Sequence, residues 1–170
     1  SSFSTVFHAV YSAGGIKEPG SLRNMIVNRN GRNIATVDVY DFLMNGNRSG
    51  DIRLEEGDVI LVPSYRTLVK VNGKVKRPMF FELKEGESLA NLIEYAGGFA
   101  QGAYTSNITV VRQTGKEYEV CTVKEMDRKI FQMRNGDDVE VGELVSRFKN
   151  KISIKGAVYR SGIYQLDGET

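Results

Sequence analysis

The sequence predicts an α+β fold made of tandem copies of one small module. Two observations predict it. The first is a repeat with a period of 83 residues: Ala13-Gly14-Gly15 recurs as Ala96-Gly97-Gly98, and residues 69–73 (VKVNG) recur as residues 152–156 (ISIKG). The second is the order of elements in the fuller copy: hairpin, helix, hairpin, short helix, strand. That order is the β-grasp arrangement, in which one helix packs on a mixed sheet of four or five strands, with a short second helix.

A short amphipathic helix is predicted before each Ala-Gly-Gly, because apolar residues recur there at helical spacing. The two apolar stripes are Val6, Ala9, Val10, Ala13 and Leu89, Leu92, Ile93, Ala96. Ser4 or Thr5 and Ser88 are the expected N-caps, since a hydroxyl can accept from the free amides of the first turn. The glycine pair is typical of a helix C-cap, and we favour that interpretation over a phosphate-binding loop.

Two alternating segments follow each helix, and turn residues join them into hairpins. The first hairpin pairs residues 24–27 with 34–37 through Asn30-Gly31, and the second pairs 108–111 with 118–123 through Thr114-Gly115. A short helix then follows at 39–43 or 124–128. Each copy closes with a strand after a Gly-Asp turn, at residues 57–62 and 136–141.

An opening hairpin, residues 68–73 and 79–83, precedes the helix only in the second copy. We therefore expect three parts: residues 1–66 are a repeat that lacks its opening hairpin, 67–150 are a complete repeat, and 151–170 are the opening hairpin of a third repeat. Isolated hairpins are marginal in water. We accordingly predict that the 151–170 hairpin completes residues 1–66, most plausibly of a neighbouring chain, as a swapped dimer.

Composition and charge exclude several classes of protein. The chain has 23 Lys and Arg against 21 Asp and Glu, a formal net charge of +2, which argues against a nucleic-acid partner. One cysteine and one histidine exclude an intramolecular disulfide and metal sites built from several thiolates or two histidines. The apolar runs are too short to span a bilayer. We expect no metal and no cofactor.

Few residues are candidates for catalysis. His8 falls off the apolar stripe of its helix, which predicts a half-exposed surface side chain. Cys121 lies in an alternating strand with no histidine nearby in sequence, which predicts a buried structural thiol. Residues 135–138 (NGDD) are typical of a turn and lack the spaced oxygen ligands of a calcium loop. We expect no catalytic residue and no enzymatic activity.

Three motifs occur in an informative order: residues 69–78 (VKVNGKVKRP), a helix ending in Ala-Gly-Gly, and residues 37–43 (VDVYDFL) followed by 54–63 (LEEGDVILVP). Together they resemble the SLBB (soluble ligand-binding β-grasp) repeats of bacterial polysaccharide export proteins. The resemblance covers nearly the whole chain. Two departures are Ser161-Gly162 in place of Pro78-Met79, and Glu140 in the closing strand of the second copy.

The resemblance implies a periplasmic segment of a Wza-like outer-membrane protein, whose domains stack into oligomeric rings around a channel for capsular polysaccharide or exopolysaccharide. It implies weak, multivalent contact with that polysaccharide, assembly as a homo-oligomer, and an inner-membrane polymerisation or export partner. The alternative is a β-grasp domain that binds a small ligand or supports a cofactor in a redox or uptake complex. That alternative predicts a concave apolar pocket with a few polar groups.

Candidate contact residues for an anionic polysaccharide are basic or aromatic and fall in or near turns. They are Lys74, Lys76, Arg77, Tyr104, Tyr159 and Arg160. Lys70 adds to the positive charge of the same opening hairpin, and Arg160 is the counterpart of Arg77 one period later. The plainer role for the lysines, which we favour over contact with a ligand, is to protect an edge strand from uncontrolled pairing.

Overall fold

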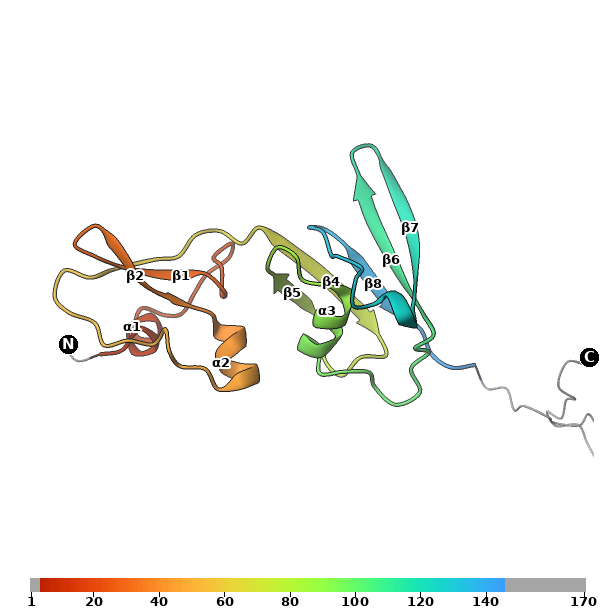
Figure 1. Ribbon diagram of the computed structural model, residues 1–170, viewed down its shortest axis with the longest axis horizontal. Helices are drawn as coiled ribbons and strands as arrows, with labels where there is room; N and C mark the ends of the chain where they lie inside the picture. The colour runs from red at the N-terminus through yellow and green to blue at the C-terminus, as the bar shows by residue number, and fades with distance from the viewer. Residues whose placement is uncertain (1–3, 146–170) are drawn as a thin grey trace, which may run out of the picture.

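The computed structural model describes residues 4–145, which form two units that follow one another along the long axis of the molecule (Figure 1). We refer to residues 4–64 as the N-terminal unit and to residues 67–145 as the C-terminal unit. The helices are α1 (Val6–Ser12), α2 (Val39–Asn45), α3 (Leu89–Tyr95) and the 3-10 helix η1 (Glu125–Asp127). The strands are β1 (Met25–Arg29), β2 (Arg32–Val37), β3 (Val59–Leu61), β4 (Thr67–Gly73), β5 (Phe80–Leu83), β6 (Asn107–Thr114), β7 (Glu117–Lys124) and β8 (Asp138–Val141).

The N-terminal unit contains a three-stranded antiparallel sheet in the order β2-β1-β3. Asn30 and Gly31 join β1 to β2 with φ of +52° and +78°, the left-handed conformation that a two-residue hairpin turn needs. The Thr5 hydroxyl caps α1 by accepting from the amide of His8, and Asp38 caps α2. The predicted hairpin and both predicted helices are thus confirmed.

The C-terminal unit contains a five-stranded mixed sheet in the order β5-β4-β8-β6-β7. β4 and β8 run parallel, and the other neighbours are antiparallel. Ser88 caps α3 in a reciprocal capping box with Asn91. One helix packed on a mixed sheet, with the short η1 as second helix, confirms the predicted α+β class and its β-grasp arrangement.

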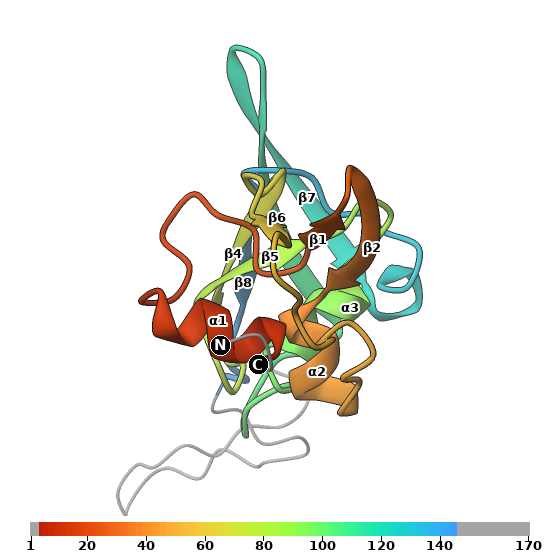
Figure 2. The ribbon, with the colours of Figure 1, turned by 90° about the vertical axis from the view of Figure 1, so that its left-hand side faces the viewer.

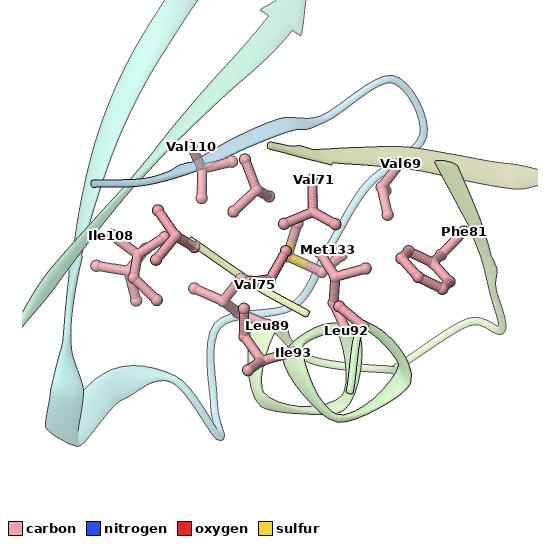
Figure 3. Close-up of a cluster of buried hydrophobic side chains, with 14 of the residues drawn as sticks. Val69, Val71, Val75, Phe81, Leu89, Leu92, Ile93, Ile108, Val110 and Met133 are labelled. Atoms are coloured by element: carbon pink, nitrogen blue, oxygen red, sulfur yellow. The ribbon is translucent and has the colours of Figure 1, made fainter. Parts of the chain in front are cut away.

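The core of the C-terminal unit lies between α3 and the sheet (Figure 3). Leu89, Leu92 and Ala96 present the predicted helical stripe, and all three are completely buried. Alternate residues of the sheet face them, including Val71 of β4 and Val139 of β8. Burial of such side chains contributes about 1.5–3 kcal/mol each, so this cluster is the main source of stability in the unit.

The two units share one strand register. Ile26 pairs with Leu61 in the first sheet, and Thr109 pairs with Glu140 at the corresponding place in the second. A bidentate ion pair repeats at the same point: the Arg29 guanidinium donates to Asp58 at 2.8 and 2.7 Å, and the Arg112 guanidinium donates to Asp137 at 3.0 and 2.8 Å. Each aspartate also accepts a backbone amide three residues before it, which holds the Gly-Asp turn. The sequence repeat is therefore also a structural repeat.

Three details differ from the sequence predictions. Ala13 ends the apolar stripe of α1 but is exposed, whereas its counterpart Ala96 is buried. Cys121 is half-buried at the margin of the core, because it lies on β7, an edge strand. Lys70 lies on β4, which has neighbours on both sides, so it does not protect a sheet edge. The predicted hairpin at 151–170 lies outside the described residues.

Candidate polysaccharide-contact surface and the junction between units

Lys74, Lys76 and Arg77 lie in one loop, between β4 and β5, as the sequence predicted for a single hairpin turn. The backbone of this loop is bound to the end of α3. The amide of Lys76 donates to the Gly98 carbonyl at 3.1 Å, and the amide of Arg77 donates to the Ala96 carbonyl at 2.8 Å. The Arg77 guanidinium adds a bond to the Tyr95 carbonyl at 2.9 Å. Arg77 thus satisfies helix-terminal carbonyls, a structural role that sequence reasoning did not assign to it.

The Ala-Gly-Gly motif permits this close approach. Gly97 has φ of +87°, and a Cβ built on it would lie 3.1 Å from the Cβ of Lys76 and 3.2 Å from an Arg77 guanidinium nitrogen. A side chain at this position would therefore be strained and would press on the basic loop. The motif is a helix C-cap, as predicted. The loop that carries the candidate residues packs directly on it.

Tyr104 lies at the same end of the sheet, where its backbone is bound to the residue that follows β8. Its amide donates to the Gly142 carbonyl at 2.8 Å, and the next residue, Glu143, forms an ion pair with Lys74 at 3.6 Å. The Tyr104 ring is 39% exposed. The structure therefore gathers Lys74, Lys76, Arg77 and Tyr104 at one end of the C-terminal unit. Tyr159 and Arg160 lie outside the described residues.

The junction between the two units is a network of buried charges centred on Arg23. Its guanidinium donates to Asp38 at 3.2 Å and to Glu87 at 2.5 Å, and it also reaches the Glu82 carbonyl at 3.2 Å. Arg23 and Asp38 belong to the N-terminal unit, whereas Glu82 and Glu87 belong to the C-terminal unit. A single buried arginine therefore links the two units through its bonds.

Aromatic rings and a third carboxylate complete the junction. The Arg23 guanidinium lies 4.7 Å from the centre of the Tyr40 ring and 4.8 Å from that of Tyr95, within cation–π distance of both. Buried Glu82 accepts from the Ser21 hydroxyl at 2.5 Å and from the Leu22 amide at 2.7 Å. Each of these contacts crosses from one unit to the other, except the contact between Arg23 and Tyr40.

Electrostatics at the junction favours the charged forms of the ion pairs. Burial alone lowers the pKa of Arg23, but its hydrogen bonds to Glu87 and Asp38 outweigh burial and raise that pKa. Burial alone raises the pKa of Asp38, but bonds from Arg23 and Lys84 outweigh it and lower that pKa. Burial and the hydrogen bond to Glu87 raise the pKa of Tyr95 to about 12. The Arg23–Asp38 pair is therefore charged across the neutral pH range.

A polar cleft of about 680 Å³ runs along this junction. Most of its lining residues are polar in type, and the basic ones come from both units and from between them: Arg23 from the N-terminal unit, Arg66 between the units, and Lys84 and Arg134 from the C-terminal unit. Glu82 and Glu85 also line it. Lys84 is already paired with Asp38 at 2.7 Å. The cleft has the size and polarity for a sugar unit but mixes both signs of charge, so it is a second candidate surface beside the basic loop.

The described residues contain no cluster of metal ligands. Within 4–145 no three of His, Cys, Asp and Glu gather as metal ligands, and no helix is both long and apolar enough to cross a membrane. His8 is exposed on α1. Asp137 of the Gly-Asp turn is fully engaged by Arg112 and the Arg134 amide. Asp137 therefore has a structural role in the turn.

Sequence reasoning missed the junction residues. Asp38 and Tyr40 lie in the 37–43 motif that carried the family resemblance, but nothing in one sequence shows that an arginine 15 residues earlier lies between them and the second unit. The repeated Arg29–Asp58 and Arg112–Asp137 pairs could have been predicted from the sequence, because the two arginines are 83 residues apart and both aspartates follow a glycine.

Comparison with known proteins agrees with the arrangement of the C-terminal unit. Residues 68–123 match the SLBB domain family. Two curated relatives, both named polysialic acid transport protein KpsD, from Escherichia coli, are each 32% identical to the chain. One alignment spans 129 residues, 74% of this chain and 22% of the relative, and the other spans 103 residues, 58% and 18%. The chain thus corresponds to about a fifth of the length of these relatives.

Proposed function

Because this chain carries an SLBB domain at residues 68–123, we propose that it is a segment of a polysaccharide export protein that contacts the polymer and helps to assemble the conduit. The observation that carries the proposal is the combination of the SLBB match with two relatives named for polysialic acid transport, whose alignments reach well beyond that domain. As in the sequence prediction, we place it in the periplasm as part of an outer-membrane protein. The proposed role is binding and assembly, with no catalytic step.

The junction network supports the assembly role. A unit that helps to build a ring must present its neighbours at a fixed angle, and the Arg23 network ties the two units together through charge-assisted bonds to Asp38 and Glu87. Domains usually move relative to one another unless their interface is large and hydrophobic. This junction is polar, so in our proposal its buried, hydrogen-bonded charges are what limits that motion.

Exposed apolar side chains on β7 support a lateral contact. β7 is an edge strand, and the β6–β7 hairpin projects from the body of the molecule in both ribbon views (Figure 2). Tyr118 and Val120 on β7 are 73% and 66% exposed. An unpaired strand edge with apolar side chains is a template for contact with another chain. We propose this edge as a contact between subunits of the homo-oligomer; an inner-membrane partner would act on the assembled protein.

The basic loop is the surface we assign to the polymer. The Lys74 amide is bound to the Val141 carbonyl of β8, and the Lys76 amide to the Gly98 carbonyl after α3, so little backbone freedom is lost when the loop binds a polymer. Contact with an anionic sugar through exposed ammonium groups is weak and salt-sensitive. Weak contacts repeated around a ring gain strength when one long polymer engages several at once.

A binding experiment tests the assignment. Polysialic acid of short and long chain length is titrated into the full chain, with binding followed by chemical-shift changes. A Lys74→Gln/Lys76→Gln variant is compared with an Arg66→Gln/Arg134→Gln variant, which removes the same charge from the junction cleft. We expect the loop variant to weaken binding several-fold and the cleft variant to bind normally. The reverse pattern would move the polymer to the cleft, and no binding by any form would remove polymer contact from the proposal.

A cellular experiment tests the export role as a whole. The gene is deleted in its source bacterium, and polysaccharide is measured at the surface and in the periplasm. Loss of surface polymer that the intact gene restores, and that a version lacking residues 67–145 does not, is the expected result. Unchanged surface polymer would favour the small-ligand alternative and redirect the search to the grooves of the N-terminal unit.

A further inference from the structure

Each unit has a free sheet edge at the same place in the fold. Among the described residues, β2 pairs only with β1, and β7 pairs only with β6. The two edge strands are counterparts, because Met25 pairs with Val37, and Ile108, which follows Met25 by 83 residues, pairs with Val123. The two edges can therefore be compared position by position.

The edge of β2 is interrupted, whereas the edge of β7 is regular. The register of β2 against β1 shifts at Ile34, which has no partner on β1. A bulge of this kind is one of the ways in which proteins blunt a sheet edge. β7 instead pairs with β6 over all of its eight residues with no shift, from Asn107↔Lys124 to Thr114↔Glu117. Of these two edges, β7 is therefore the one that another strand can follow.

The backbone groups that face outward on β7 belong to alternate residues. Thr114 and Glu117 flank a two-residue turn and so form a hydrogen-bonded pair, and such pairs alternate along an antiparallel ladder. At the other end, the Glu125 amide donates to the Ser106 carbonyl at 3.0 Å, which fits the same alternation. The residues whose amides and carbonyls point away from β6 are therefore Tyr118, Val120 and Thr122.

The same three residues carry exposed side chains on the face of the sheet away from α3. Tyr118 and Val120 are 73% and 66% exposed, and Thr122 is exposed beside them. Ile34, at the position of Val120 in the other unit, is 41% exposed. The β6–β7 hairpin projects from the body of the molecule, so β7 is accessible to a second chain (Figure 2).

We propose that β7 pairs with the β7 strand of a second copy of this chain, antiparallel and about a two-fold axis at Val120. The inference rests on the proposed contact between subunits at this edge and names the strand that makes the contact on the other side. Addition of a strand to an open sheet edge is an established mode of recognition between chains. A two-fold contact is complete with two copies, so a larger assembly combines it with a different contact.

The outer face of β7 complements itself in this register. Val120 lies opposite Val120 of the second copy, and Tyr118 lies opposite Thr122. Cross-strand pairs of β-branched and aromatic residues stabilise antiparallel sheets, and here they cover the two exposed apolar side chains of the strand. The outward amides and carbonyls of the same residues face one another, so each finds a partner.

Charge favours this register over its neighbour nearer the turn. Glu119 lies opposite Cys121, so no carboxylate lies directly opposite another. Lys116 does lie opposite Lys124, but at the ends of the paired segment, where both are exposed and the solvent screens them. A shift of two residues would place Glu119 opposite Glu119 of the second copy, where like charges destabilise the pair.

The mass of the full chain in solution, measured by light scattering over a series of concentrations, tests the pairing. Val120→Lys and Val120→Glu each place two like charges opposite each other on the axis. The matched controls are Ile34→Lys and Ile34→Glu, at the counterpart position on β2. We expect the parent and both controls to be dimers and each Val120 variant to have half that mass.

Mixing the two Val120 variants gives the decisive result. Lysine then lies opposite glutamate, so we expect a mixed dimer that contains one copy of each, identified by native mass spectrometry with one variant labelled with ¹⁵N. A monomeric parent would overturn the proposal, as would association that Val120→Lys leaves unchanged. Variants that stay monomeric when mixed would show that Val120 contacts a different surface of the second copy, and would also overturn it.

A cross-link tests the register independently. The double variant Glu119→Cys/Cys121→Ser is mixed with the parent under mild oxidation. Opposite residues of a pair that is not hydrogen-bonded have Cα atoms about 4.5 Å apart, close enough for a disulfide between positions 119 and 121. We expect cross-linked dimers in the mixture and far fewer from either protein alone, and their absence from the mixture would overturn the register. Either failure leaves the export role to the polymer titration and the gene deletion, which do not depend on this pairing.

Discussion

Replacement of Arg23 by methionine should uncouple the two units and destabilise the chain. The arginine side chain is 5% exposed and binds Asp38 and Glu87, which are 12% and 17% exposed. Removing one partner of a buried ion pair costs about 3–5 kcal/mol, because the other partner is left without compensation. Without Arg23, Asp38 would still form its ion pair with Lys84 at 2.7 Å, and Glu87 would still accept hydrogen bonds from the Lys84 amide and the Tyr95 hydroxyl. We therefore expect a loss near the lower end, about 3 kcal/mol.

The matched control is Lys74→Met. The Lys74 side chain is 40% exposed and pairs with Glu143, which is 68% exposed, at 3.6 Å. Exposed pairs contribute about 0–1 kcal/mol, so this variant should unfold almost as the parent does. Urea unfolding followed by circular dichroism gives both free energies of unfolding. A difference between Arg23→Met and Lys74→Met below about 1 kcal/mol would refute the conclusion that the junction charges stabilise the chain.

Three further variants probe single features of the fold by the same unfolding measurement. Leu92→Ala empties the centre of the α3 core and should cost about 2–5 kcal/mol, whereas Leu43→Ala, at a position 71% exposed on α2, should cost much less; similar losses would contradict the described core. Ser88→Ala removes the cap of α3 and should cost about 1 kcal/mol, and no loss would show that the capping box is not formed in solution. Bonds from the Arg29 guanidinium lower the pKa of Asp58 to about 2, below the 3.8 of an unperturbed aspartate. The ion pair's contribution to the free energy of unfolding is therefore complete above pH 3.8 and is lost as the pH falls toward 2. Asp58→Asn should flatten the pH dependence of stability in that window, and an unchanged slope would exclude the pair as its source.

Elements with strong local signals were predictable from the sequence. Asn30-Gly31 specifies a tight hairpin, Ser88 specifies a helix start, and Ala96-Gly97-Gly98 specifies a helix end, because each depends on backbone geometry that few residues adopt. The recurrence of such signals at one period then identified the module. The mixed sheet of four or five strands was predicted from the order of the elements rather than from any single strand, and the order of its strands was not predicted.

Contacts between distant residues were not predictable in the same way. Arg23 contacts Glu87 across 64 residues, and no local pattern marks either residue as buried. The predicted closing strands give a second example: Val62 is 40% exposed beside a groove, whereas its counterpart Val141 is 1% exposed, and neither strand's own sequence marks that difference. Periodicity reports which face of an element is apolar, and what covers that face is decided by tertiary structure.

The parallel pairing of β4 with β8 has a mechanical consequence. The chain enters the C-terminal unit at the start of β4 and leaves it at the end of β8, and the two strands lie side by side from Lys70↔Asp138 to Gly73↔Val141. Tension applied to the two ends of the unit pulls these strands in opposite directions along their axes. All hydrogen bonds between them are then loaded at the same time and must break together, whereas strands peeled from one end break their bonds in turn. A chain of such units is therefore suited to carry force along its length without opening its cores.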